Sequence, residues 1–463
     1  MNSILNRWRS DKLKTALEIS WLLTVFFCFF GSAVFLIKIP GIPALYPFRV
    51  LLPVTAALYL IWAVREKRNP WKGASFAQRV SYVLCAVLAV YSTLSLRFAI
   101  DFSYTAPLWI TLCFDLVFFA LMLELCNDRN LFITTVRCAL VSLLIQILMG
   151  IREVFFGGIF TQRYNVNHNF AFFDGLWQSP VVATGNTNDY VMGIVFTLAL
   201  VLLYWAWRGH KGKLDWIPVV LIAPTYLLLR AAGARLCMIS FWLLLVGFAL
   251  HMLTQGKKKV WMLIVTALLL FVVAFGCGDF QITPPAAQET PVTAESTAAP
   301  VQQSLKEEIF TVDAQTGETQ LNLALSGGVR VDLLLCALDC FVQSKGMGVG
   351  LGNTAQTAKL TADSRGGVWG IHCFLARMAA DFGIWFLIPL LMIAGSMLWF
   401  GVTYVYDGIK THQWTTVMTG VLYILSVVIY PIASTASGDA QNSLPMWLFL
   451  GGIVLFPVHT ADK

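Results

Sequence analysis

The chain has 463 residues, of which 58% are hydrophobic and only 12% charged, with a formal net charge of +7. Its mean hydropathy is +0.71. Such a composition excludes a soluble domain with a single membrane anchor, because the apolar surface is too large to hide from water and must face lipid. The apolar runs do not alternate with a period of two, which excludes membrane-spanning strands.

Runs of roughly 20 apolar residues, the length of a helix that crosses the hydrocarbon layer, recur along the chain. We therefore predict an all-α polytopic membrane protein with about twelve transmembrane helices. In chain order these cover residues 17–37, 48–64, 80–96, 107–126, 131–151, 188–207, 214–230, 236–253, 260–277, 383–406, 414–432 and 444–458. The first run is too long for the apolar part of a signal peptide, and no small-residue cleavage site follows it, so we expect a membrane helix there.

Lysine and arginine gather in every second connection. Basic clusters follow the second, fourth, sixth and eighth helices, at residues 65–79, 129, 208–213 and 257–259. Cytoplasmic loops carry an excess of Lys and Arg. We therefore expect these connections and both chain termini to be cytoplasmic, with the chain in a cytoplasmic (inner) membrane.

One large extracytoplasmic loop, between helices 9 and 10, divides the chain into three parts. Residues 1–277 hold helices 1–9, residues 278–371 form the loop, and residues 372–463 hold a re-entry helix and helices 10–12. Within the loop, residues 282–304 are rich in Pro, Thr, Ala, Gln and Glu, which predicts a flexible linker. Residues 330–371 predict an amphipathic helix on the membrane face and a glycine-rich turn.

Two of the six histidines, His168 and His372, lie outside the cytoplasm in this arrangement. His168 is in a polar loop stretch, where we expect a solvated side chain. His372 stands where the large loop re-enters the membrane, and a neutral imidazole there can take a proton from a hydroxyl group near neutral pH. Asp115 lies inside an apolar run, where a carboxylate is either a functional group or a hydrogen-bonded packing partner.

Several arginines also lie outside the cytoplasm. Arg230 and Arg235 flank the short connection Ala-Ala-Gly-Ala, Arg330 opens the amphipathic helix of the loop, and Arg163 lies in the connection after helix 5. A guanidinium pairs with phosphate oxygens through two parallel hydrogen bonds, so these side chains predict an anion site beside a base. The alternative for each arginine is an interaction with lipid headgroups.

The alternate glycines of residues 346–352 do not form a nucleotide-binding fingerprint, because no strand precedes them and no crossover unit surrounds them. They either let the backbone approach a ligand or make a tight turn beneath the loop. The sequence also has no metal-ligand spacing of His, Cys or carboxylate residues.

His372 is followed eleven positions later by Gly383, where the next helix begins. In this spacing the sequence resembles the O-antigen ligase and O-antigen polymerase family of bacterial membrane glycosyltransferases. Further stretches of residues 150–400 are similar to family motifs in the same order, namely Gly185-Asn-Thr-Asn-Asp189, Gly233-Ala-Arg235, and Gly327-Gly-Val-Arg330 with the glycine run after it. The chain departs from the family pattern at Thr187, Ala234, Leu236 and Cys373.

The resemblance implies transfer of a glycan from an undecaprenyl diphosphate carrier to an acceptor hydroxyl on the extracytoplasmic face. His372 would deprotonate the acceptor, while Arg235 and Arg330, with Arg230 and Arg163, would bind the diphosphate. The implied partners are the lipid-linked oligosaccharide donor, a glycan or envelope acceptor and the lipid bilayer. No cofactor, metal or nucleic acid is expected. The acceptor is either a second carrier-linked glycan, for a polymerase, or another envelope molecule, for a ligase.

Two other functions fit a chain of this kind. A lipid-linked oligosaccharide flippase or another polytopic transporter also has a dozen spans, but many transporters consist of two related halves, and no internal repeat is visible here. The second alternative is a non-enzymatic membrane scaffold whose large loop binds a partner. Only the predicted placement of His372 and the arginines outside the cytoplasm argues against it.

The charge alternation makes a testable prediction about topology. In intact cells, a membrane-impermeant thiol reagent should label a cysteine introduced at position 295, in the large loop, and should not label one at position 258, in a basic cluster. The reverse pattern would contradict every side assigned above.

Overall fold

The computed structural model describes residues 11–31, 45–157, 165–170, 173–182, 184, 186–208, 216–277, 310–312, 319–321, 323–363, 373–436 and 444–461. The helices up to the large loop are α2 (Lys12–Phe27), α3 (Pro47–Arg65), α4 (Phe76–Ser95), η1 (Leu96–Phe98), α5 (Phe102–Leu125), α6 (Arg129–Phe156), α7 (Thr187–Arg208), α8 (Ile217–Ala232), α9 (Arg235–Leu253) and α10 (Lys257–Gly276). Those after it are α12 (Leu323–Gln343), α13 (Asn353–Asp363), α14 (Phe374–Phe382), α15 (Ile384–Lys410), α16 (Trp414–Ser434) and α17 (Leu444–Ala461).

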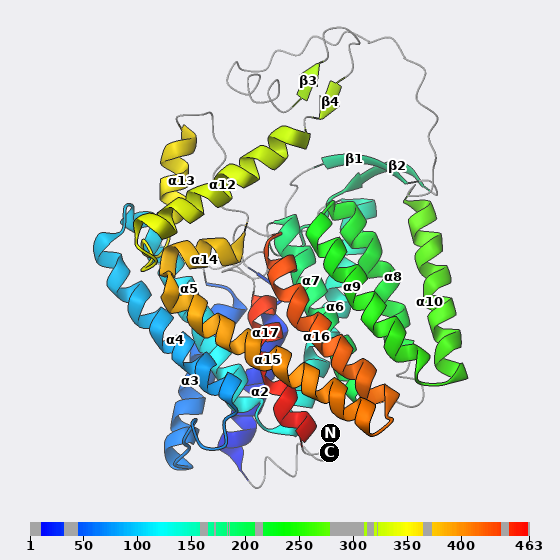
Figure 1. Ribbon diagram of the computed structural model, residues 1–463, viewed down its shortest axis with the longest axis horizontal. Helices are drawn as coiled ribbons and strands as arrows, with labels where there is room; N and C mark the ends of the chain where they lie inside the picture. Colours follow the sequence, from blue (N-terminus) through cyan, green and yellow to red (C-terminus); the bar gives the residue numbers. More distant parts are fainter. Residues whose placement is uncertain are drawn as a thin grey trace.

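The described part of the chain is a helical bundle with two short hairpins in its connections (Figure 1). β1 (Asn165–Phe170) pairs antiparallel with β2 (Phe173–Gln178), and β3 (Phe310–Val312) pairs antiparallel with β4 (Thr319–Leu321). Within the described residues, nine helices are long and apolar enough to cross a membrane, namely α3, α4, α5, α6, α7, α9, α10, α15 and α16. The chain is therefore a multi-pass membrane protein.

Each of the twelve predicted ranges overlaps one helix, but the first range was wrong at its C-terminal end. Instead of continuing to residue 37, α2 ends at Phe27 and a turn follows. A helix that ends inside a bundle leaves carbonyl groups without intrahelical partners. Here α6 supplies a donor to one of them, because Ser142 Oγ donates to the carbonyl of Phe26. Gln146 Nε2, also on α6, donates to the carbonyl of Phe29 in the turn that follows.

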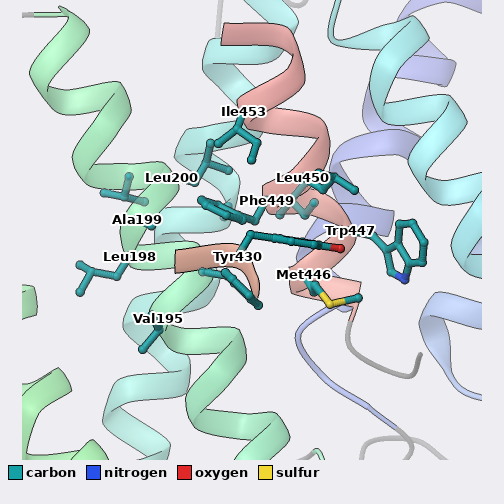
Figure 2. Close-up of a cluster of buried hydrophobic side chains, with 14 of the residues drawn as sticks. Val195, Leu198, Ala199, Leu200, Tyr430, Met446, Trp447, Phe449, Leu450 and Ile453 are labelled. Atoms are coloured by element: carbon teal, nitrogen blue, oxygen red, sulfur yellow. The ribbon is translucent and has the colours of Figure 1, made fainter. Parts of the chain in front are cut away.

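The bundle is organised around α7. Every residue from Tyr190 to Trp207 is buried, so this helix is enclosed on all sides. Figure 2 shows the cluster in which Leu200 of α7 lies beside Phe449 and Ile453 of α17. Helices in lipid associate through close packing rather than through the hydrophobic effect.

Contacts between helix ends show which ends lie together. Lys14 of α2 pairs with Asp128 at the start of α6, and Arg65 at the end of α3 pairs with Asp11. His459, near the end of α17, is hydrogen-bonded to the carbonyl of Cys126. The opposite end of the bundle carries both hairpins and α12, α13 and α14 (Figure 1). We call this the loop end.

The large loop differs from its prediction in one respect and lies partly outside the described residues. We expected the amphipathic helix to begin at Arg330, but α12 already begins at Leu323 and passes through the two glycines before Arg330. The predicted linker at residues 282–304 lies outside the described residues.

Glycine at the contact between α15 and α16 gives a test of packing. A Cβ at Gly408 would lie 2.8 Å from the backbone nitrogen of Val417, whereas one at Gly395, also in α15, would meet no described atom within 4 Å. We expect Gly408→Ala to lower the free energy of unfolding by about 1–3 kcal/mol, because backbone atoms cannot move aside cheaply. Gly395→Ala is the matched control and should not destabilise the protein. Thermal unfolding in detergent measures both, and equal unfolding temperatures for the two variants would contradict the prediction.

Candidate functional site

A pocket of about 320 Å³ opens among helix ends at the loop end of the bundle. It lies between the turn after α2, the starts of α3, α7 and α17, and the second half of α6. Its lining is Cys28, Phe29, Gly31, Tyr46, Arg49, Leu143, Gln146, Thr184, Asp189, Tyr190, Gly193, Ile194, Leu444 and Pro445. A mostly apolar pocket with a few polar groups is typical of a ligand site.

The end of α2 creates one wall of this pocket. Because α2 stops at Phe27, the chain turns at Cys28 and Phe29, and both residues line the pocket. Gln146 of α6 is 3% exposed and holds this turn through the hydrogen bond from its Nε2 to the carbonyl of Phe29, at 2.9 Å. The backbone carbonyl of Gln146 accepts a hydrogen bond from the hydroxyl of Tyr190, at 2.6 Å, which joins α6 to α7.

Arg49 brings a positive charge to the pocket from the first turns of α3. Its Nη2 donates to the hydroxyl of Thr111 on α5 at 3.2 Å, and its guanidinium lies 5.0 Å from the centre of the Tyr46 ring. One turn further along α5, Asp115 is 1% exposed, and the charge of Arg49 acts on it. Asp115 Oδ2 has no hydrogen-bond partner among the described residues. The indole of Trp447 on α17 also acts on this carboxyl, so the role of Asp115 as a functional group or as a packing partner stays a prediction.

The start of α7 is fixed by one capping contact, and the segment before it is held by a side chain of α6. Asn186 Oδ1 accepts from the backbone N–H of Asn188, which satisfies one of the first donors of the helix. Just before it, Glu153 Oε2 accepts from the backbone N–H groups of Val181 and Val182, at 2.9 and 2.7 Å. Together these contacts hold Asp189, in the first turn of α7, on the pocket wall.

A second polar cluster lies beneath the large loop, around the glycine run. Gly346, Gly348, Gly350 and Gly352 all have positive φ, between 78° and 99°. The backbone of this glycine run packs directly on the backbone at the start of α15, since the carbonyl of Gly346 accepts a hydrogen bond from the N–H of Ile384 at 2.8 Å. A Cβ at Gly383 would overlap this carbonyl. The glycines therefore make a tight turn against the junction of α14 and α15, which explains why glycine is needed at position 383.

Asp381 of α14 holds the end of this turn and is fully buried. Its carboxylate accepts from the backbone N–H groups of Gly352 and Thr354, at 2.9 and 3.1 Å. Arg377, one helical turn earlier and 2% exposed, lies 3.9 Å from the same carboxylate and donates to the hydroxyl of Tyr104 on α5 at 3.3 Å. Burial raises the pKa of Asp381, although Arg377 and the two N–H groups act in the opposite direction.

α17 connects the pocket to the start of α14. Leu444 and Pro445 line the pocket, and the ring of Trp447 lies 6.4 Å from that of Phe374, the first residue of α14. Phe374 follows His372 by two positions in the sequence. The segment that carries the predicted base thus leads into a helix that packs close to the pocket.

The predicted arginines are only partly described. Arg230, half-buried in the last turn of α8, and Arg235, exposed at the first position of α9, lie on either side of a turn at Gly233, where φ is 65°. Ser179 Oγ donates to the carbonyl of Ala231, which joins this turn to the segment before α7. Arg330 lies within α12, and its side chain is outside the described structure, as are Arg163 and the predicted base His372.

Sequence reasoning missed four polar residues that the structure makes prominent: Arg49, Gln146, Arg377 and Asp381. A signal was present for the first two, since a polar side chain inside an apolar span is a functional candidate by default. That rule was applied to the carboxylates inside the apolar runs and not to Arg49 or Gln146. For Arg377 and Asp381 the signal was weaker, because an i, i+4 ion pair is equally common on exposed helices.

No protein-family model matches this chain, and no curated protein matches its sequence. The resemblance to O-antigen ligases and polymerases therefore rests on the motifs quoted above. Within the described residues, no group of three or more His, Cys, Asp or Glu side chains is placed to hold a metal ion.

The carboxylate of Asp381 can be tested through stability. Asp381→Ala removes the acceptor of two backbone hydrogen bonds and leaves the buried guanidinium of Arg377 without its counter-charge. We expect a loss of about 3–5 kcal/mol in the free energy of unfolding, together with faster proteolysis near residues 346–352. Asp339→Ala, at an exposed position of α12, is the control and should change neither. Equal stabilities of the two variants would mean that Asp381 does not hold the turn.

Proposed function

We propose that this protein is an O-antigen ligase-like membrane glycosyltransferase. It transfers or polymerises glycan from an undecaprenyl diphosphate carrier onto an acceptor hydroxyl, on the extracytoplasmic face of the bacterial cytoplasmic membrane, with twelve spans and both termini in the cytoplasm. The observation that carries the proposal is the pocket with Arg49 at the loop end of the bundle, close to the helix that follows His372.

The arrangement suits a lipid-linked donor. The carrier tail would remain among the apolar faces of the spans, while its diphosphate and glycan would lie at the loop end. Arg230 and Arg235 flank the turn that Ser179 joins to the segment before α7, and we propose that they bind the diphosphate at the same end. Arg330 and Arg163 are proposed to complete the anion site.

The chemistry assigned to each residue follows from its charge. His372 would take the proton of the acceptor hydroxyl as that oxygen attacks the anomeric carbon of the donor sugar. The bond from that carbon to the diphosphate would break, and the arginines would stabilise the negative charge that develops on the leaving group. We propose that the protein needs no metal ion for this step, because preformed guanidinium donors supply the positive charge.

The rigid turn beneath the loop supports the proposed placement of the base. α14 is held at its end by Gly383 and Asp381 and on its side by Arg377, and its first residue contacts Trp447. We propose that His372, two residues before α14, is positioned by this fixed helix. Pre-organisation of this kind is worth orders of magnitude in rate.

The proposal predicts that His372→Ala cuts transfer by roughly 100-fold to 10,000-fold while membrane insertion and donor binding persist. Arg235→Ala and Arg330→Ala should weaken donor binding as well as rate, because a phosphate contact exists in both the bound donor and the transition state. Lysine at these positions should rescue only part of the loss.

The assay uses purified protein reconstituted into sealed lipid vesicles, a diphosphate-linked glycan donor, an acceptor glycan and excess chelator. His168→Ala, at the other histidine predicted on this face, is the matched control and should keep wild-type turnover. Full activity of His372→Ala, strict dependence on Mg²⁺, or movement of the donor across vesicles without any transfer would contradict the proposal. The last result would favour the flippase alternative.

A further inference from the structure

α12 presents three different faces. One face is buried in an apolar cluster with α13 and α14, whose members are Leu333, Ala337, Cys340, Ala358 and Ala380. A second face is polar and exposed, with Asp339 and Gln343. The third is exposed and apolar, and it consists of Leu334, Leu335, Leu338 and Val342, each between 41% and 63% exposed. Residues three and four apart lie on the same side of a helix, so these four side chains form one stripe. We call it the apolar stripe of α12.

This arrangement differs from that of a helix on the surface of a soluble domain, which has one apolar face, directed at the core. An apolar face beside a polar face on the exposed side is typical of a helix that lies in the plane of the membrane interface. The described apolar stretch of α12, Leu333–Gln343, is too short to cross the hydrocarbon layer. In Figure 1, α12 crosses the loop end of the bundle instead of running along the spans beneath it.

The stripe leads into a surface that faces lipid. At the end of α12, the ring of Phe341 and the side chain of Ile384 both come within 3.6 Å of the place that a Cβ of Gly346 would take. Ile384 is the first residue of α15, which is long and apolar enough to span the membrane. The large apolar side chains on the same exposed side of α15 are Ile384, Ile388, Leu391 and Trp399. Exposed apolar side chains therefore extend from a membrane span to α12.

We propose that α12 is an in-plane membrane helix, whose apolar stripe inserts among the acyl chains of the lipid leaflet at the loop end. Its buried face then anchors α13 and α14 to the bilayer. A second copy of the chain is a poorer occupant of the stripe, because each partner of a stable interface buries about 800 Å², more than four side chains of one helix offer. This inference does not depend on the proposed glycan transfer.

Photochemical cross-linking tests the contact with lipid. The photoreactive amino acid p-benzoylphenylalanine is introduced at Leu338, in the stripe, or at its exposed neighbour Asp339, on the polar face. Leu391, on the exposed side of α15, is the positive control. The full-length protein is irradiated in phosphatidylcholine nanodiscs, and lipid adducts are counted by mass spectrometry of the intact chain. We expect adducts at Leu338 and Leu391, and about fivefold fewer or none at Asp339.

The other outcomes contradict the proposal. Equal adducts at Leu338 and Asp339, or none at Leu338 when Leu391 reacts, would show that the stripe does not face lipid. A cross-linked dimer at Leu338 would assign the stripe to a second copy, and a cross-link within the chain would assign it to another segment of the protein. Leu335, in the same stripe, is the second position if the protein modified at Leu338 does not fold.

Hydrogen exchange tests the anchoring. Leu338→Glu places a carboxylate in the stripe, where lipid disfavours a charge, whereas Gln343→Glu places one on the polar face of the same helix. In nanodiscs, we expect Leu338→Glu to speed backbone exchange in α14 by roughly tenfold, because α12 would leave the bilayer and release the helices packed on it. Gln343→Glu should leave this exchange unchanged. The same exchange rates in both variants would overturn the anchoring.

Discussion

The architecture depends on one constraint, the complete enclosure of α7. All side chains from Tyr190 to Trp207 are buried, and most are apolar, so neighbouring helices must cover every face of this helix. In lipid this enclosure is held by close packing rather than by exclusion of water. Glycines allow it, since Gly193 of α7 packs on Pro445 and Gly452 of α17 packs on Leu200. The fixed helix carries Asp189 to the wall of the pocket, so the central packing of the bundle also positions the candidate site.

Polar groups at the loop end serve both the fold and the site. Gln146 holds the turn after α2 with its side-chain nitrogen and also lines the pocket, so one side chain contributes to both. Arg49 similarly joins α3 to α5 through Thr111 while it lines the pocket. Polar groups in a membrane protein are costly where they are unsatisfied and therefore tend to mark function. Their gathering around one pocket is the reason to treat it as the candidate functional site.

The turn at residues 346–352 has a mechanical role that differs from a ligand-binding loop. Its glycines bring backbone against backbone at Gly383, and Asp381 accepts two of its N–H groups. The hydroxyl of Tyr91 on α4 donates to the carbonyls of Met347 and Gly348 from the other side. The turn thus fastens the start of α15 and the short α14 to the bundle. The eleven-residue spacing from His372 to Gly383 spans α14, because this helix begins two residues after His372 and ends directly before Gly383.

The amino-acid sequence by itself determined that the chain is a multi-pass membrane protein and where most helices lie, because the length of an apolar run must match the thickness of the hydrocarbon layer. It also identified the start of α7 and the importance of Gly383. Tertiary structure alone decided that α2 stops at Phe27, because the carbonyl of Phe26 at its end and that of Phe29 in the following turn find donors on α6, more than a hundred residues away in the sequence. The same holds for the pocket, since Arg49, Gln146 and Asp189 come from three separate helices. Hydropathy shows how far a helix extends through lipid, but only packing decides which of its faces meet, and polar groups from distant segments can form a site only after those faces are joined.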